Sequence, residues 1–388
     1  MKGLFLDASE QLAAVFRATT QPGDPPIDVN IQTQVDPAEL PGKLAGYDVV
    51  LNDHTFMPTE VMRGCTGLRH VIFLGTGARS YMNPEELAAL GIIVHTIKGY
   101  GGAAHFGTAF FDSEAALLGQ GLNGVVVTSE NIHHRPLVEK AVAAGVKTIL
   151  CEKPLATTLE DARAMVTLCA DNDVRLATAF PCRYAPPFQR LRARVQAGTI
   201  GDVLAIRGTN RGSMPGGWFV DRALSGGGAV IDHTVHVADL NRVLLGREAV
   251  EVQAEIGSGF YHQGWDDTGF LTIKYDGGIF ATLDTSWSRP KTYPTWGDVT
   301  IQVVGTGGIL DLDLVAQNLT HYDDRAGRVS WSHWGSGMDA GLVADFLRLA
   351  QGEDVPDLAT GEDGLRALAV ALAAYRSAET GQPAAVEN

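Results

Sequence analysis

Cysteines, basic runs and long apolar runs are all scarce in this sequence. Only four cysteines occur among the 388 residues, at positions 65, 151, 169 and 182, without Cys-x-x-Cys spacing. We therefore expect reduced, mostly buried thiols. No apolar run approaches the ~18 residues of a transmembrane helix. The first stretch turns polar at Asp7, too early for a signal peptide. These absences predict a soluble protein of the cytoplasm.

Positive charge is also in short supply. Lysine and arginine number 30 against 45 acidic residues, so the formal net charge is −15, and the basic residues form no run. Nucleic acids and anionic membranes are therefore poor partners, although a local basic pocket for a phosphate is compatible with this balance. The hydrophobic content of 45% and charged content of 19% are typical of a globular protein. The length suffices for two or three domains with full cores.

The first half of the chain alternates short apolar runs with helical patterns. This alternation is typical of a parallel sheet with helices on both faces. A glycine-rich stretch at 99–108 interrupts the pattern, which then resumes. The predicted strands are 4–6, 27–33, 47–52, 70–74, 92–97, 124–128, 148–151 and 175–178, and the predicted helices are 9–18, 37–45, 58–64, 84–90, 112–119, 134–144 and 158–172.

From about residue 202 the pattern changes to longer alternating runs separated by turn residues such as Asp276-Gly277. This spacing predicts a large, open, mostly antiparallel sheet. The expected fold class is an α/β Rossmann-like nucleotide-binding domain followed by an α+β domain that contains this sheet. The predicted parts are a flavodoxin-like or Rossmann-like segment at 1–105, the remainder of the dinucleotide-binding domain at 106–180, and a substrate-binding and oligomerisation domain at 181–388.

Three consecutive glycines, Gly226 to Gly228, precede a helical pattern that ends at Gly246. Asp232 and His236 are four residues apart, so they lie on one face of that helix. A bare backbone followed by a carboxylate and an imidazole suits a ligand lying close to the main chain. The alternative is a glycine linker before an ordinary helix.

Five short stretches in a defined order carry a family resemblance. They are Val127-Thr128-Ser129-Glu130-Asn131-Ile132-His133-His134, Glu152-Lys153-Pro154-Leu155-Ala156, Phe180-Pro181-Cys182-Arg183-Tyr184, the glycine-Asp-His helix, and Val304-Gly305-Thr306-Gly307-Gly308. Glu-Lys-Pro is a weak signal alone, but it is fairly specific when the glycine-Asp-His helix follows. From about residue 110 to the end, the chain thereby resembles the Gfo/Idh/MocA oxidoreductases.

The resemblance implies that Lys153 lies at the nicotinamide edge and hydrogen-bonds the reacting oxygen, that Asp232 orients the substrate, and that His236 exchanges the proton. This division of roles agrees with elementary chemistry. Removing a hydride from a secondary alcohol requires a group that accepts the hydroxyl proton, and histidine titrates near neutral pH. A lysine beside the developing oxyanion stabilises its charge.

Candidate cofactor residues follow two strand ends, where nucleotides bind in such sheets. Glu152 would lie beside the ribose, and the adjacent Lys153 would contact the cofactor at its nicotinamide edge. The other candidates follow the strand at 124–128; they are Thr128, Ser129, Asn131 and His134. His134 opens a helix, so an alternative role for it is helix capping.

The front of the chain departs from the family pattern. Residues 68–81, Gly91-Ile92-Ile93-Val94 and Gly99-Tyr100-Gly101 resemble the substrate-binding domain of D-2-hydroxyacid dehydrogenases. Within this segment, Gly75 and Gly77 admit two interpretations. They bind a pyrophosphate in a first βαβ unit whose sheet continues through 124–128, or they form a turn in a flavodoxin-like module. In the first case Lys98 follows the second strand, and a cation there favours NADP slightly over NAD.

Three further groups have alternative roles. Arg183 and Tyr184 line the sugar site or pack internally. His233, with Asp232 and His236, has the composition of a metal site, but we expect no metal because His233 should point away from the other two.

The predicted function is an NAD(P)-dependent oxidoreductase that transfers a hydride between nicotinamide and a hydroxyl or carbonyl of a sugar, polyol or related cyclic alcohol. The resemblance also implies a homodimer or homotetramer. Two alternatives are a non-catalytic ligand-binding or sensor protein with a degenerate cofactor site, and an NAD-assisted glycosidase.

Overall fold

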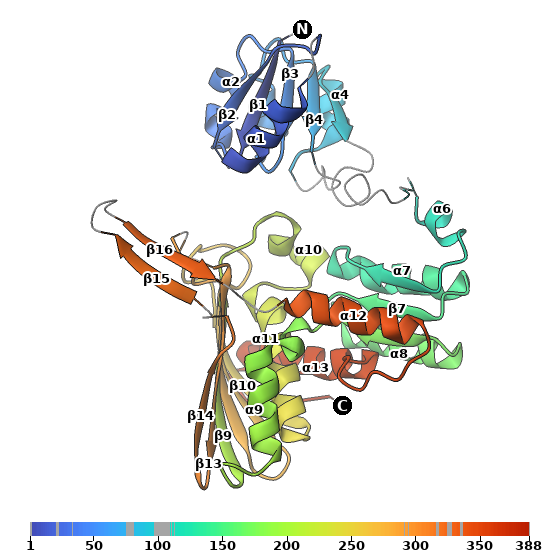
Figure 1. Ribbon diagram of the computed structural model, residues 1–388, viewed down its shortest axis with the longest axis vertical. Helices are drawn as coiled ribbons and strands as arrows, with labels where there is room; N and C mark the ends of the chain where they lie inside the picture. The colour runs from blue at the N-terminus through green and yellow to red at the C-terminus, as the bar shows by residue number, and fades with distance from the viewer. Residues whose placement is uncertain are drawn as a thin grey trace. The chain divides into compact units, whose positions relative to one another are not determined.

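The computed structural model describes residues 2–20, 23–32, 34–74, 81–96, 109, 111, 113–290, 292–293, 295–315, 318–323, 328–333 and 337–387. The chain forms two compact units, Met1–Leu117 and Leu118–Asn388. Each is drawn in Figure 1 and is described by itself below. None of the helices in these described ranges has the length and apolarity that a membrane span requires.

The first unit contains a five-stranded parallel sheet with the order β2-β1-β3-β4-β5, which is the flavodoxin-like order. Its core is formed by side chains such as Leu6, Val50 and Val71. The strands are β1 (Gly3–Ala8), β2 (Ile27–Ile31), β3 (Val49–Asn52), β4 (His70–Phe73) and β5 (Ile93–Thr96), and the helices are α1 (Glu10–Thr19), η1 (Pro37–Glu39), α2 (Leu40–Lys43), α3 (Thr59–Met62) and α4 (Pro84–Ala89). A short helix, α6 (Glu114–Leu118), follows in the chain.

The second unit begins with a three-stranded parallel sheet of order β6-β7-β8. Its strands are β6 (Gly124–Val127), β7 (Thr148–Cys151) and β8 (Arg175–Thr178), with the helices η3 (Asn131–His133), α7 (His134–Ala143) and α8 (Leu159–Asp171) between them. The predicted continuation of one sheet from the strand at 92–97 into 124–128 is not present among the described pairings, because β5 and β6 belong to different sheets.

A seven-stranded sheet of order β14-β13-β9-β12-β11-β10-β17 dominates the rest of this unit. All its neighbours are antiparallel except β9 and β12, so the predicted fold class is confirmed. The strands are β9 (Val203–Gly212), β10 (Ala249–Gly257), β11 (Thr268–Tyr275), β12 (Phe280–Ser286), β13 (Gly297–Gly305), β14 (Gly308–Asp313) and β17 (Ala384–Ala385). A separate hairpin joins β15 (Asn318–Asp323) and β16 (Arg328–His333).

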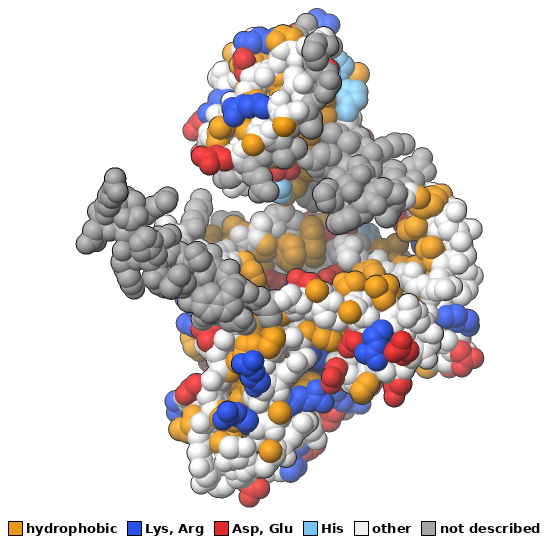
Figure 2. Space-filling model, in the orientation of Figure 1, with side chains coloured by type: hydrophobic (Ala, Val, Ile, Leu, Met, Phe, Trp, Pro, Cys, Tyr) orange, Lys and Arg blue, Asp and Glu red, His pale blue; other side chains and the backbone are white. Residues whose placement is uncertain are grey.

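Helices cover one face of the seven-stranded sheet (Figure 1). The long helices α11 (Ala229–Leu245) and α13 (Gly361–Thr380) pack on it and share its apolar core. Strand residues on the opposite face include the exposed Phe270 and Phe280. The remaining helices are η4 (Pro181–Tyr184), α9 (Pro186–Gln196), η5 (Gly217–Val220), α10 (Arg222–Ser225) and α12 (Met338–Ala350). In the space-filling view, lysine and arginine side chains of this unit are scattered among acidic ones (Figure 2).

Candidate active site

The three glycines before α11 make room for the protein's own side chains. A Cβ on Gly227 would collide with the Tyr375 hydroxyl, and one on Gly228 would collide with Asp266. The Asp266 carboxylate instead accepts hydrogen bonds from the amides of Gly228 (3.0 Å) and Val230 (2.8 Å) and from the Tyr375 hydroxyl (2.9 Å). Thus a carboxylate from outside the helix satisfies the first amides of α11.

Lys153 and Asp232 meet, although they are distant in sequence. Lys153 follows the carboxyl end of β7, and its Nζ donates to Asp232 Oδ1 over 2.6 Å and to the Asp232 carbonyl oxygen over 3.2 Å. The two side chains are only 17% and 12% exposed. A short charge-assisted pair at this depth fixes the position of the ammonium group.

His236 lies one turn beyond Asp232 on α11 and is buried. Its ring stands edge-on to Phe180 at 6.1 Å between centroids. Within the described part of the chain, its Nδ1 has no hydrogen-bond partner although the atom is buried. An unpartnered buried polar atom costs free energy, and a bound molecule that supplied a partner would recover that cost.

The pKa values of His236 and Asp232 are both lowered, but with opposite consequences for charge. Burial lowers the pKa of His236 well below its usual value, and the nearby Lys153 charge lowers it further. Burial alone would raise the pKa of Asp232, but the Lys153 ammonium and the His233 ring outweigh it and hold that pKa well below the usual range. At neutral pH the site therefore holds a neutral imidazole beside an ionised carboxylate.

The second oxygen of Asp232 has partners that the sequence reasoning missed. Asp232 Oδ2 lies 3.2 Å from His233 Nε2 and accepts from Trp287 Nε1 over 3.2 Å. The expectation that His233 points away from Asp232 is therefore wrong. The ring lies between this carboxylate and β9, where its Nδ1 is 3.0 Å from the Asn210 carbonyl oxygen, and the second contact holds the ring beside Asp232. No motif or spacing connects Trp287 to this helix, so only the fold reveals it.

The predicted cofactor residues are placed unequally. Thr128 is exposed, and Ser129 and Glu152 are half-buried. Asn131 is buried and donates to the Ser225 carbonyl oxygen over 2.8 Å, which ties its loop to the glycine stretch. Burial raises the pKa of Glu152, although Lys153 opposes the shift. Gly75, Gly77 and Lys98 lie outside the described residues.

His134 is fully enclosed by backbone. Its Nδ1 lies 3.1 Å from the Pro154 carbonyl oxygen, and its Nε2 lies 3.1 Å from the Ser129 carbonyl oxygen. Burial lowers the pKa of this ring. The side chain therefore links the two strand-end loops, and this geometry does not support the predicted cofactor contact.

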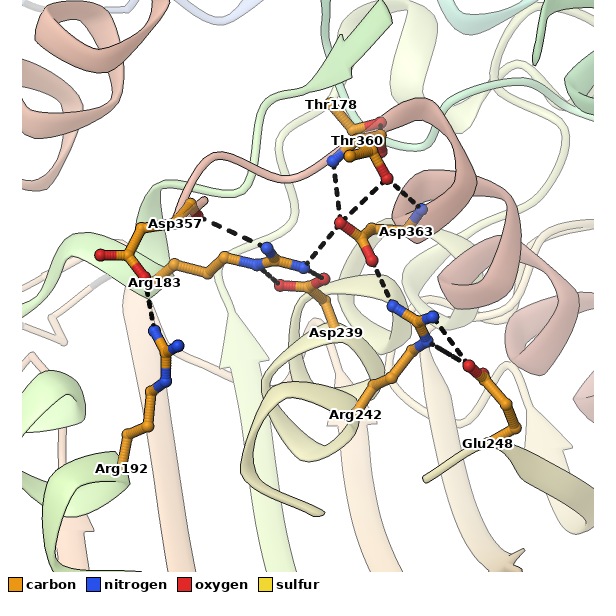
Figure 3. A network of polar contacts seen from close by, with 9 residues as sticks. All are labelled: Thr178, Arg183, Arg192, Asp239, Arg242, Glu248, Asp357, Thr360 and Asp363. Carbon is orange, nitrogen blue, oxygen red and sulfur yellow. Dashed lines mark hydrogen bonds and ion pairs between the residues drawn. The ribbon is translucent and has the colours of Figure 1, made fainter. Parts of the chain in front are cut away.

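Arg183 and Tyr184 are engaged inside the fold, and Figure 3 shows the network around Arg183. Arg183 donates through Nε and Nη2 to the two oxygens of Asp239 at 2.7 and 2.5 Å, and Nη2 lies 3.3 Å from Asp363. The Tyr184 hydroxyl donates to Asp345 over 3.0 Å. The expected substrate contacts are not supported, because the polar groups of both residues have protein partners.

Comparisons with known proteins match two parts of the chain to one protein family. Residues 76–180 match the NAD-binding Rossmann-fold part of the Gfo/Idh/MocA oxidoreductase family, and residues 188–311 match its C-terminal domain. A 1,5-anhydro-D-fructose reductase of Ensifer adhaerens is 31% identical over 277 residues, which are 69% of this chain and 80% of that protein. A myo-inositol dehydrogenase of Streptomyces leeuwenhoekii is 32% identical over 275 residues, covering 69% of this chain and 82% of that protein.

A solved structure shows the same fold. The GenD2 enzyme from gentamicin A biosynthesis, crystallised with NAD, superposes with a TM-score of 0.66 at 24% sequence identity, covering 83% of this chain and 89% of that one. None of these comparisons supports the resemblance of the front segment to D-2-hydroxyacid dehydrogenases, which stays a prediction.

Proposed function

Because this chain belongs to the Gfo/Idh/MocA family of oxidoreductases, we propose that it transfers a hydride between NAD(P) and a hydroxyl or carbonyl carbon of a sugar, polyol or related cyclic alcohol. The observation that carries the proposal is the Lys153–Asp232 pair near His236, whose buried Nδ1 has no partner among the described residues. Family members named as reductases and dehydrogenases of sugars and inositols support the substrate class.

The described residues fit a nicotinamide cofactor at its reacting end. The buried Nδ1 of His236 has no partner among them, and Lys153 is held at a strand end by a carboxylate. We propose Thr128, Ser129, Asn131 and Glu152 around the remainder of the cofactor. Gly75 and Gly77 at its pyrophosphate stay a proposal without the continuous sheet that the sequence predicted, because β5 and β6 belong to different sheets. When bound, the nicotinamide accepts or gives the hydride. The proposal includes a slight preference for NADP over NAD, because the cation of Lys98 suits a 2′-phosphate.

The protein's own residues divide the remaining work. Lys153 donates a hydrogen bond to the reacting oxygen and stabilises negative charge that develops there. Asp232 holds that ammonium in place, because its Oδ1 lies only 2.6 Å from Lys153 Nζ. The neutral His236 ring accepts the hydroxyl proton during oxidation and returns it during reduction. The lowered pKa of His236 keeps the ring neutral at neutral pH, which is the form that can accept a proton.

The test begins with cofactor binding. Titrating the purified protein with NADH and NADPH, and following the cofactor fluorescence, should show saturable binding. Assays with oxidised and reduced cofactor on a panel of aldoses and inositols should then show turnover. Saturable sugar binding without cofactor binding would favour the sensor alternative. Release of sugar from an aryl glycoside in the presence of NAD would favour the glycosidase alternative.

The proposal includes a homo-oligomer in the cytoplasm. Leu204, Phe270, Phe280 and Ile309 leave apolar side chains exposed on strands of the seven-stranded sheet, which suits association of two copies. All four cysteines are free and buried, as a reducing compartment allows. The division into parts at 1–105, 106–180 and 181–388 also stays a proposal. The match to the NAD-binding domain spans residues 76–180 and so crosses the boundary between the two compact units.

A further inference from the structure

His233 stands next to the proposed site without a role in the chemistry above. Its side chain is only 3% exposed, and both ring nitrogens face oxygen atoms of the protein. Nε2 lies 3.2 Å from Asp232 Oδ2, and Nδ1 lies 3.0 Å from the Asn210 carbonyl oxygen. A buried ring with two such partners has one well-defined orientation.

Strand β9 holds this ring from two sides. Asn210 Nδ2 donates back to the His233 carbonyl oxygen over 3.0 Å, so the two residues bond reciprocally. Gly212 passes directly against the ring, since a Cβ there would lie 2.7 Å from His233 Cε1. The Trp296 ring closes another side in an edge-on contact, with 5.9 Å between centroids.

The Asp232 carboxylate divides its two oxygens between different tasks. Oδ1 accepts from Lys153, and Oδ2 lies at 3.2 Å from both His233 Nε2 and Trp287 Nε1. An ionised carboxylate only accepts hydrogen bonds, so His233 contacts it as a donor. Two donors on Oδ2 prevent rotation of the carboxylate and keep Oδ1 directed at the ammonium of Lys153.

We propose that His233 is a positioning residue that acts through Asp232 on Lys153, with Trp287 as the second donor. The proposal rests on the function proposed above for Lys153 and Asp232. It assigns His233 no proton transfer and no contact with substrate. It requires that the geometry of the Lys153 ammonium depend on a hydrogen bond from the far side of the carboxylate.

Three substitutions of His233 test the contacts of its two ring nitrogens separately. His233→Gln keeps a donor that reaches Asp232, His233→Asn keeps only a donor that reaches the Asn210 carbonyl, and His233→Leu keeps neither. We expect kcat to fall by about 10- to 100-fold in the Leu and Asn variants, with KM little changed, and to be largely restored in the Gln variant. Equal losses in Gln and Asn, or wild-type kcat in Leu, would overturn the proposal.

A second measurement does not depend on turnover. Acetylation of Lys153 by acetic anhydride, followed by peptide mass spectrometry without cofactor or substrate, should be faster in the Leu and Asn variants than in wild type and the Gln variant. Identical rates in all four proteins would refute the positioning role. The labelling rates of the four proteins could differ as expected while the wild-type protein shows no oxidation or reduction of any substrate. That result would refute the function proposed for the site and leave the positioning role standing.

Gly212→Ala provides a variant in which the side chains of His233 and Asp232 are themselves unchanged. The added methyl group would press on the His233 ring. We expect the same faster labelling of Lys153 as in His233→Leu, with thermal unfolding recorded in parallel to confirm that the protein is folded. A folded Gly212→Ala protein with wild-type labelling and wild-type kcat would count against the proposal.

Discussion

Helix α11 carries two buried aspartates that serve different ends. Asp232 shares its oxygens among Lys153, His233 and Trp287, next to a histidine whose Nδ1 has no partner in the described ranges. Asp239, two turns further along, receives two donors from Arg183 in a network that continues to Asp363 and Arg242 (Figure 3). The first cluster leaves bonding capacity unused, whereas the second directs its charges at one another. Between these two clusters the difference is the unpartnered nitrogen of His236, since both clusters are charged and buried.

The largest expected effect comes from removing the ammonium of the first cluster. Lys153→Met should reduce kcat by about 100- to 1000-fold or more, because the developing oxyanion loses its donor. The variant should stay folded and still bind NADPH, as fluorescence titration and thermal unfolding would record. A turnover rate near that of wild type would remove Lys153 from the chemistry. The control is Lys140→Met, which changes an exposed lysine in the last turn of α7.

Breaking the second cluster should affect folding instead of chemistry. Asp239→Asn leaves the buried Arg183 guanidinium without its main counterion, and uncompensated buried charges cost about 3–5 kcal/mol. We expect that loss in the free energy of urea unfolding, while the protein that remains folded keeps its kcat. A tenfold drop in kcat with unchanged stability would erase the distinction between the clusters.

The pH dependence of stability should distinguish the clusters further. The pKa of His236 is lowered by burial in the folded state, so the unfolded chain takes up a proton first as pH falls below about 6.5. This group therefore destabilises the fold by up to about 1.4 kcal/mol per pH unit below that point, until the folded-state pKa is reached. His236→Phe should flatten this decline between pH 6.5 and 5.5 in urea unfolding. An unchanged slope would contradict a neutral buried ring.

The smallest expected effect concerns Tyr184, which the sequence suggested as a substrate contact. Tyr184→Phe removes one hydrogen bond to Asp345 and should cost about 0.5–1.5 kcal/mol of unfolding free energy. KM for the sugar should stay unchanged. A clear rise in KM without loss of stability would return Tyr184 to the substrate site.

Local pattern predicted most elements, since alternation and helical periodicity directly reflect burial on the parallel sheets, on the seven-stranded sheet and on α11. The helix α9 was missed because it begins with two prolines and buries only Phe188 and Leu191 in an otherwise polar stretch. The family resemblance implied that Lys153, Asp232 and His236 share one site, but it did not predict the direct contact between Lys153 and Asp232. Such patterns do not reveal partners chosen by packing, such as Trp287 on Asp232 or Asp239 on Arg183. Those contacts depend on which segments pack beside α11 in the folded chain.

The grip of Asp266 and Tyr375 on the first amides of α11 fixes the rotation of that helix about its own axis. Successive helical residues are set about 100° apart. One residue inserted between Gly228 and Asp232 would therefore swing both aspartates and His236 away from their partners together. The rotation of this single helix therefore sets the proposed reacting groups and the Arg183 network together. The loop before it is constrained in length as well as at Gly227 and Gly228, where a Cβ would collide with Tyr375 and Asp266.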